Sequence, residues 1–456
     1  MINIPVALEK LKNLSKSSED EKIKIELNTL HSADLAEIFE NISQDERLQY
    51  FEYLDEEKAA NLLEELNPQI QVELLSSIGE EKAANIIMEM PRNSVADVLG
   101  DLSDEETELY LAKLPIRVSS QIRELLSYEE DTAGGIMNSE VLTVNQNMTV
   151  KETLEFIRTK AETSNIDFYY IYVVDKTNHL LGVLSLRSLI TSSPYTKVEK
   201  IMTTEVIKVN VADDQEITAD TLMKYGFLAM PVVDDYGKLK GIVTWDDAQE
   251  ITEEETTEEI YASSGIISTN VIDEDEILSG HIMQAVKART PWLLITLVGE
   301  FFAVNVANHF DHTLHVLPII AIFMPLLAGL GGNIGTQSIT LMVRGLSTGQ
   351  INLNFAVHHI FRELKVGLII GLMFGLVVTF VTWSWKGNLV LGTVVGLSML
   401  TNMTLATILG TMTPFILKRF NIDPAVASGP FIATTIDVLG LAVYFSLVTL
   451  SLKFLL

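Results

Sequence analysis

Five long apolar stretches in the last third of the chain constrain its fold more than any other feature. They run over residues 291–310, 316–343, 364–386, 389–417 and 426–452. A helix that spans a bilayer needs about 20 mostly apolar residues. These stretches lack the polar face at helical spacing that a helix on the surface of a soluble domain carries. The sequence therefore predicts a membrane domain of five helices over residues 289–456.

Charge is divided unevenly between this apolar part and the rest of the chain. The 456 residues include 32 Lys and Arg against 61 Asp and Glu, a net charge of −29. Nine of those basic and five of those acidic residues lie in 281–456, so that part carries +4 and residues 1–280 carry −33. Nucleic-acid binding requires basic patches. We therefore expect cations as partners and no nucleic acid, and the absence of cysteine excludes thiolate chemistry.

The cations that flank the apolar stretches predict an orientation. If the acidic part is cytoplasmic, the inner flanks carry Lys287, Arg289, Arg344, Arg362, Lys365, Lys418 and Arg419, and the outer flanks carry Lys386 and Lys453. Short cytoplasmic loops are enriched in Lys and Arg. We expect a multi-pass protein of the inner or plasma membrane, with its N-terminus cytoplasmic and its C-terminus outside. The start of the chain is amphipathic, so no signal peptide is expected.

Two carboxylates fall inside the apolar stretches, where ionisable groups are costly and therefore candidates for function. Glu300 lies midway along the first stretch and either has a function or is only hydrogen-bonded between helices. Asp437, in the last stretch, is surrounded by Gly, Pro and Thr, which let helices approach closely and expose backbone carbonyls. This setting is typical of a cation pathway lined by oxygen.

The second apolar stretch offers a matching set of polar groups. Its segment 329–337 combines four glycines with Asn333 and Gln337, which are four residues apart and share one helical face. Tight glycine packing with hydrogen bonds between helices explains the glycines equally well. It does not explain the lone carboxylate of Asp437.

The loop after the first stretch carries a group of potential metal ligands. These are His309, Asp311, His312 and His315. They either bind a transition metal or belong to a solvated loop.

Residues 1–130 read as a series of short helices in an acidic N-domain. The motif EEKAANLL at 56–63 recurs 24 residues later as EEKAANII at 80–87. A repeat of this length holds about two helical arms, which predicts a small helical solenoid.

Residues 131–250 contain a duplicated α/β unit. A strand, a turn and a strand over 169–185 return over 230–247, and helical periodicity precedes each pair near 150–160 and 216–225. The pattern resembles a tandem pair of CBS domains, 131–200 and 201–250, a fold that commonly senses ligands such as adenine nucleotides.

A dense acidic run joins this pair to the first apolar stretch. Its members are Asp246, Asp247, Glu250, Glu253, Glu254, Glu255, Glu258, Glu259, Asp273, Glu274, Asp275 and Glu276. Such runs are usually solubilising linkers, because like charges repel one another. The position of this run instead favours a connecting helix over 251–288 that couples the soluble part to the membrane part.

The order of these parts resembles the MgtE family of magnesium channels and transporters over essentially the whole chain. The most specific markers are the segments 128–137, 331–335 and 423–437. The resemblance implies a homodimer in the lipid membrane, with a pore on its two-fold axis lined by the second and fifth spans. It also implies that Mg²⁺ is held at Asp437 with oxygen from Gly329, Asn333, Ala433 and Gly440. Some relatives carry asparagine in place of Gly429, where Asp423 could contribute instead.

The same resemblance implies Mg²⁺ sensor sites in the soluble part. The matching acids are Asp97, Asp214, Glu216, Asp247, Glu250, Glu255, Glu258 and Glu259. Two acids of the family pattern are absent, at Asn93 and Gly226, so individual sites are expected to be weaker or rearranged. Bridging Mg²⁺ would draw the acidic surfaces together and close the pore.

ATP is a further expected ligand, as a regulator. Family CBS pairs bind ATP, and Tyr170, Arg187 and Phe227 are the candidate contacts for adenine, phosphate and ring stacking. The acid expected for the ribose is replaced by Ser188. All three candidate residues also have ordinary packing explanations.

We therefore expect a multidomain protein: an all-α solenoid, α/β tandem CBS domains, a connecting helix and a five-helix transmembrane domain. Its expected function is Mg²⁺-selective influx, closed by intracellular Mg²⁺. One alternative is transport of another divalent cation such as Mn²⁺ or Co²⁺, because hard oxygen sites discriminate imperfectly. A second alternative is a membrane-anchored Mg²⁺ sensor that conducts nothing. An enzyme is not expected, because the chain has no P-loop and no nucleophile–base arrangement.

Overall fold

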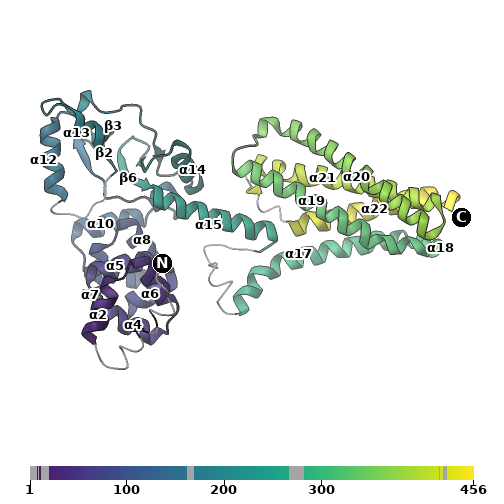
Figure 1. Ribbon diagram of the computed structural model, residues 1–456, viewed down its shortest axis with the longest axis horizontal. Helices are drawn as coiled ribbons and strands as arrows, with labels where there is room; N and C mark the ends of the chain where they lie inside the picture. Colours follow the sequence, from purple (N-terminus) through teal and green to yellow (C-terminus); the bar gives the residue numbers. More distant parts are fainter. Residues whose placement is uncertain are drawn as a thin grey trace. The chain divides into compact units, whose positions relative to one another are not determined.

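The computed structural model describes residues 8, 10–11, 20–161, 169–266, 282–420, 422–424 and 429–455. These residues divide into two compact units, Met1–Glu253 and Glu254–Leu456, which we name the first unit and the second unit (Figure 1).

The first unit begins with short α-helices that stack in two rows. In the described residues these are α2 Asp20–Thr29, α3 Ser32–Glu40, α4 Gln44–Glu52, α5 Glu56–Glu64, α6 Pro68–Ser77, α7 Glu80–Glu89, α8 Arg92–Gly100, α9 Asp104–Leu111 and α10 Ile116–Leu125. Helices α3, α5, α7 and α9 pack one on the next in one row, and α2, α4, α6, α8 and α10 do so in the other. This arrangement confirms the predicted helical solenoid.

The repeated sequence motif forms two equivalent neighbouring helices, α5 and α7. Each buries two alanines and two larger aliphatic residues, at 59, 60, 62 and 63 in α5 and at 83, 84, 86 and 87 in α7. The two glutamates that open each motif lie in the first turn, where they favour the positive end of the helix dipole. The repeat is therefore a unit of core packing.

Two small sheets of identical topology follow the solenoid. The first contains β1 Thr143–Asn145, β2 Tyr170–Val174 and β3 Leu180–Ser185, and the second contains β4 Val209–Asn210, β5 Ala229–Val233 and β6 Leu239–Thr244. In each sheet the first strand is parallel and the last antiparallel to the central strand, and the register shifts at the same place. Helices α12 Val150–Ala161 and α14 Gln215–Tyr225 lie where periodicity predicts them. The duplicated CBS architecture is confirmed.

Shorter elements complete the pair of CBS domains. They are α11 Ala133–Ile136, α13 Leu186–Thr191 and the 3₁₀ helix η1 Val198–Lys200. The parallel strands β1 and β4, of three and two residues, are too short to leave an alternating pattern in the sequence.

The acidic run after the second sheet forms a helix, α15 Trp245–Ser264. It begins before the predicted bound of the connecting helix, directly at the end of β6. Residues 267–281, with Asp273, Glu274, Asp275 and Glu276, lie outside the described residues. The predicted connecting segment 251–288 is therefore seen only up to Ile266 and from Ile282, and the domain boundaries as a whole stay predictions.

The second unit contains five helices long and apolar enough to span a membrane: Ile282–His309, Pro318–Ser347, Ala356–Lys386, Leu389–Arg419 and Gly429–Leu455. Its described elements are α17 Ile282–His309, α18 Asp311–Val316, η2 Pro318–Phe323, α19 Met324–Ser347, η3 Leu353–Phe355, α20 Ala356–Lys386, α21 Leu389–Arg419 and α22 Gly429–Leu455. Helix α20 packs along α21, α19 contacts α21 and α22, and α17 packs on α22 (Figure 1). The predicted five-helix domain is confirmed.

Candidate ion-binding sites

Helices α19 and α22 meet through small residues. A Cβ atom on Gly332 would lie 3.3 Å from the Cβ of Ala433, and one on Gly335 would overlap the side chain of Ile436. A Cβ atom on Gly331 would likewise lie only 3.0 Å from the Cγ2 atom of Ile436. The packing interpretation therefore accounts for these three glycines, because only glycine lets the two helices approach so closely.

A polar stripe runs along the adjacent face of α19. Gly329, Asn333, Gln337 and Thr340 are exposed in the single chain and recur at intervals of four, four and three residues. Gly329 has open space around its Cα. Amide groups facing lipid would lack hydrogen-bond partners, so such a stripe in a membrane helix must face protein or water.

Asp437 lies on α22, one helical turn after Ala433, and both residues are half-buried. Its Oδ1 atom is buried and has no hydrogen-bond partner within the described part of the chain. Its carboxyl group lies close enough to that of Glu300 on α17 for the two to interact. Gly299 brings α17 to this place, because it packs directly on Thr434. Two neighbouring carboxyl groups in an apolar medium require a proton or a bound cation.

Asn402 of α21 is a buried polar residue that the sequence reasoning missed. It is 1% exposed, and its Nδ2 donates a 2.8 Å hydrogen bond to the carbonyl of Leu327. Its Oδ1 is buried, has no partner among the described residues and faces Gly440, where a Cβ would overlap the amide. Asn402 thus joins α21 to both α19 and α22, and the structure places Gly440 at a packing contact. The sequence feature that could have identified Asn402 is a polar residue within an apolar stretch.

The other candidates of the membrane part lie at the ends of helices. Asp423 is exposed in the segment 422–424 between α21 and α22. Gly429 opens α22 and is buried, and a Cβ there would lie 3.1 Å from Thr336 and 3.4 Å from the carbonyl of Ser263 on α15. The end of α15 therefore contacts the start of α22, where a larger side chain would intrude. Ala425 of the predicted marker segment lies outside the described residues.

Helix α15 also makes an ionic contact with α19. The carboxylate of Glu259 lies 3.4 Å from the guanidinium of Arg344, near the end of α19. The acidic helix is thereby joined to the two helices that carry Asn333 and Asp437. Glu255 and Glu258 lie on the same helix.

In the first unit, four acids form what we name the Asp247 cluster: Glu64, Asp97, Asp247 and Glu250. Desolvation, followed by repulsion from Asp247 and Glu250, raises the pKa of Asp97 to about 7. Desolvation, then Glu65 and Asp247, raises the pKa of Glu64 to about 7. The side chains of Asp97 and Glu64 still open to solvent. A cluster of this kind gains free energy from a cation that it can exchange with solvent.

The other two acids of the Asp247 cluster, Asp247 and Glu250, also have raised pKa values. Desolvation raises the pKa of both Asp247 and Glu250, and Asp247 repels Glu250 as well. Asn93, which stands where the family pattern has an acid, donates a 3.4 Å hydrogen bond from Nδ2 to Asp247. Glu64 was missed by the sequence reasoning, because one glutamate in an acidic helix carries no local signal.

Asp214 has a structural role at the start of α14. Its Oδ1 accepts hydrogen bonds from the backbone N–H groups of Glu216 and Ile217, at 2.9 and 3.4 Å, which makes it the N-cap of the helix. Gly226 ends the same helix with a φ of 67°, a left-handed conformation that favours glycine. The missing acid at 226 is therefore explained by the helix C-cap.

The nucleotide candidates are distributed over both CBS domains. Tyr170 opens β2 and packs against a cluster that includes Ala229 and Leu239 of the second sheet, and Phe227 lies two residues before β5. Arg187 is exposed in α13. Ser188, at the position expected for the ribose acid, contacts Ser185 through a 2.8 Å hydroxyl hydrogen bond at the cap of α13.

The four potential metal ligands after the first apolar stretch lie in two helices, with His309 at the end of α17 and Asp311, His312 and His315 in the short helix α18. His315 pairs with Asp311 at 3.4 Å, and His309 stacks edge-on against Phe310. Throughout the described ranges of the chain, no three His, Asp or Glu side chains already converge on a metal position.

Comparisons with known proteins match these parts in order. A family model described as "Divalent cation transporter" matches residues 324–447, "MgtE intracellular N domain" matches 30–131, and "CBS domain" matches 133–194 and 198–252. The magnesium transporter MgtE of Thermus thermophilus is 37% identical over 337 residues, 74% of each chain. MgtE of Enterococcus faecalis is 36% identical over 74% of this chain and 72% of its own.

Two solved structures resemble the first part of the chain. The cytosolic domain of the Mg²⁺ channel MgtE in complex with ATP is 34% identical, covering 54% of this chain and 99% of that one, with a TM-score of 0.51. The soluble part of a magnesium transporter is 30% identical, covering 56% and 99%, with a TM-score of 0.51.

The five membrane helices, the intramembrane carboxylates and these matches define a membrane transporter of divalent cations. The relatives that match about three quarters of this chain are named magnesium transporters, not enzymes. The chain belongs to the MgtE family of magnesium transporters.

Proposed function

We propose that this protein is a Mg²⁺-selective channel or transporter that mediates magnesium influx and is closed by intracellular Mg²⁺. The observation that carries the proposal is the Asp437 carboxyl, which lies beside Glu300 and whose buried Oδ1 has no hydrogen-bond donor among the residues that the structure describes. An acceptor oxygen left without a donor in a membrane is costly. A passing cation satisfies that oxygen.

The ion pathway is proposed to lie between two copies of the chain. The exposed stripe of Asn333 and Gln337 on α19 needs protein or water beside it, and a two-fold partner supplies both. Asp437, Asn333 and the carbonyls near Gly329, Ala433 and Gly440 would line the pathway, with Asp423 near one end. Mg²⁺ sheds its waters reluctantly, so carboxylates from two subunits can hold it largely hydrated and still release it.

Closure is proposed to start at the Asp247 cluster and the acids of α15. Mg²⁺ bound among these acids relieves their repulsion and so favours the arrangement that brings them together. Asp214 and Glu216 would contribute at the start of α14. Two contacts carry the change to the pathway: Glu259 with Arg344, and the Ser263 carbonyl with the start of α22.

We propose that the soluble first unit is cytoplasmic and the C-terminus outside, because the short-loop cations obey the positive-inside rule with that orientation. ATP is proposed as a regulatory ligand of the CBS pair, supported by the relative solved in complex with ATP. Tyr170, Arg187 and Phe227 would contact it, and Ser188 would leave the ribose without an acidic partner.

Ion flux into liposomes that contain the purified protein tests this proposal against its alternatives. Mg²⁺, Mn²⁺, Co²⁺ and Ca²⁺ are compared under the same gradient. Flux that is greatest for Mg²⁺ supports the proposal, and flux that is greatest for Mn²⁺ or Co²⁺ supports a transporter of another divalent cation. No flux of any ion, from a protein whose thermal stability still responds to Mg²⁺, supports a sensor that does not conduct.

A further inference from the structure

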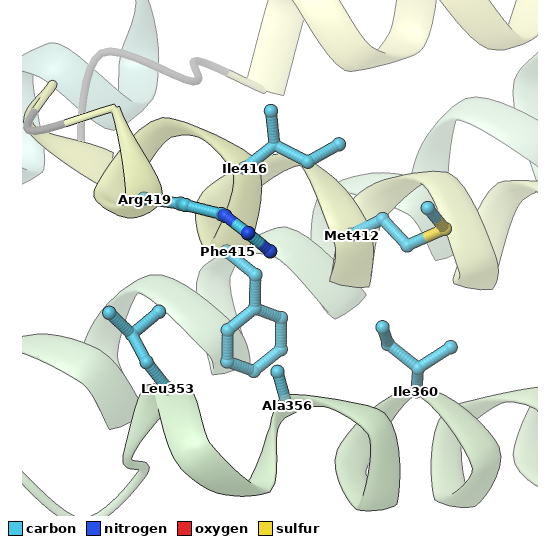
Figure 2. Close-up of a pocket in the computed structure, with 7 residues that line it drawn as sticks. All are labelled: Leu353, Ala356, Ile360, Met412, Phe415, Ile416 and Arg419. Carbon is cyan, nitrogen blue, oxygen red and sulfur yellow. The ribbon is translucent and has the colours of Figure 1, made fainter.

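An apolar groove with a cationic mouth lies in the second unit, away from the proposed ion pathway residues. Figure 2 shows its two walls, one from η3 and the start of α20 and the other from the last turns of α21. Its volume is about 350 Å³, and its lining residues are Leu353, Ala356, Ile360, Met412, Phe415, Ile416 and Arg419. Six of the seven are apolar, and Arg419 supplies the only charge among them.

Arg419 lines the groove, and three further cations lie on the same two helices, Arg362 and Lys365 on α20 and Lys418 on α21. All four are exposed, and among the residues that the structure describes none of them forms an ion pair. The adjacent carboxylate, Glu363, is 5% exposed. The groove therefore combines a hydrocarbon-lined slot with unneutralised positive charge at its mouth.

We propose that this groove binds one anionic phospholipid. An acyl chain would occupy the slot between Ile360 and Met412, and the headgroup phosphate would bind the Arg419 guanidinium in the two-pronged geometry that arginine favours. Basic pockets between membrane helices at the cytoplasmic face are suited to acidic headgroups. A free phosphate would leave the apolar slot unused.

Charge also decides against a second copy of the chain as the occupant. A two-fold interface centred here would bring the Arg419 side chains of both copies close together, and like charges in contact are costly. An anionic lipid instead neutralises them.

The floor of the groove connects it to α19. Phe415 is 5% exposed and packs in one cluster with Met342 and Leu346 of α19. Ile351, which precedes the groove residue Leu353, packs against Gly345 of the same helix. A lipid seated on Phe415 would therefore stabilise the end of α19, where Arg344 also lies.

Lipid binding to the full-length purified protein tests the proposal. Native mass spectrometry and thermal unfolding are followed during titration with dioleoyl phosphatidylglycerol, with dioleoyl phosphatidylcholine and with glycerol phosphate as the headgroup alone. We expect the phosphatidylglycerol to bind preferentially and to raise the unfolding temperature, with no effect of glycerol phosphate. Arg419→Gln is expected to weaken phosphatidylglycerol binding about fivefold, and the matched control Lys453→Gln at the other end of the domain is expected not to.

Filling the slot tests the acyl-chain part separately. Ala356→Phe, or Met412→Trp if the first variant lowers the unfolding temperature without lipid, should remove tight phosphatidylglycerol binding while Arg419 is intact. Equal binding of the two lipids, or unchanged binding in both Arg419→Gln and the filled-slot variant, would overturn the proposal. So would loss of dimer in lipid-free Ala356→Phe, because the groove would then be a subunit interface.

Discussion

Mg²⁺ binding to the soluble part should depend steeply on pH between 6 and 8. The pKa values of Asp97 and Glu64 are raised to about 7, so both carboxyls are largely protonated at pH 6 and largely ionised at pH 8. A metal ion binds the deprotonated form and must displace each proton. The ionised fraction of one such group rises about tenfold over this range, from about 9% to about 91%. Apparent Mg²⁺ affinity should therefore rise about tenfold if one proton is displaced and about a hundredfold if two are.

Isothermal titration of the full-length protein in detergent, at pH 6, 7 and 8, measures this dependence. Repeating each titration in two buffers of different ionisation enthalpy counts the protons released. Asp97→Asn should lower that count by about one proton at pH 6 and by about half a proton at pH 7, and should flatten the pH dependence. The matched control Asp45→Asn changes an exposed acid on α4 and should leave both unchanged. An affinity that is the same at pH 6 and pH 8, or a proton count that Asp97→Asn does not lower, refutes the reasoning.

The sign of the accompanying stability change is also fixed. A folded-state pKa raised above the unfolded value means that the folded protein binds more protons. Without Mg²⁺, the free energy of unfolding of the first unit should therefore fall as pH rises from about 4 to about 7, because Asp97 and Glu64 lose protons that the unfolded chain has already lost. Chemical unfolding across this range measures it, and a rise in stability would contradict the assigned shifts.

Three substitutions in the second unit test its contacts. Glu300→Gln removes one of the two interacting carboxyls and should weaken the ability of Mg²⁺ to compete with other divalent cations for entry into liposomes. Unchanged competition would show that Glu300 has only a packing role. Asn402→Leu removes the buried hydrogen bond to α19 and should cost about 1 kcal/mol of stability, seen as a lower unfolding temperature that the control Thr401→Val does not show. Glu259→Gln removes the ion pair with Arg344, a partly exposed pair worth about 0.2–1 kcal/mol. It should shift the Mg²⁺ concentration for half-closure in patch recordings by at most about fivefold, and a larger shift would mean that Glu259 acts through more than its ion pair with Arg344.

The features that could be predicted from the sequence are those whose signal is local. Apolar stretches of sufficient length predict the five spans, and a repeated helical motif predicts the solenoid. Asp437 was identifiable because a carboxylate is conspicuous in an apolar helix. Strands β2, β3, β5 and β6 are apolar runs closed by turns, whereas β1 and β4 are too short for any period to be detected.

The features that could not be predicted depend on residues distant in the sequence. Glu64 is ordinary in its own helix, and its raised pKa arises partly from Asp247. The role of Asn93 as a donor to Asp247 is equally non-local. Asn402 owes its function to the carbonyl of Leu327, 75 residues away. The family pattern named the sensor acids but not these partners, which only the folded arrangement brings together.

Magnesium uptake by liposomes carrying wild type, Asp437→Asn or Asp311→Asn tests the central claim most directly. Asp437→Asn preserves side-chain shape and removes one charge from the proposed pathway, and Asp311→Asn makes the same change on α18. Mg²⁺ entry is followed with a trapped dye, and the folded state of each variant is checked by gel filtration and thermal unfolding. The account predicts that Asp437→Asn falls to the level of empty liposomes while Asp311→Asn matches wild type. Wild-type uptake by folded Asp437→Asn would contradict it.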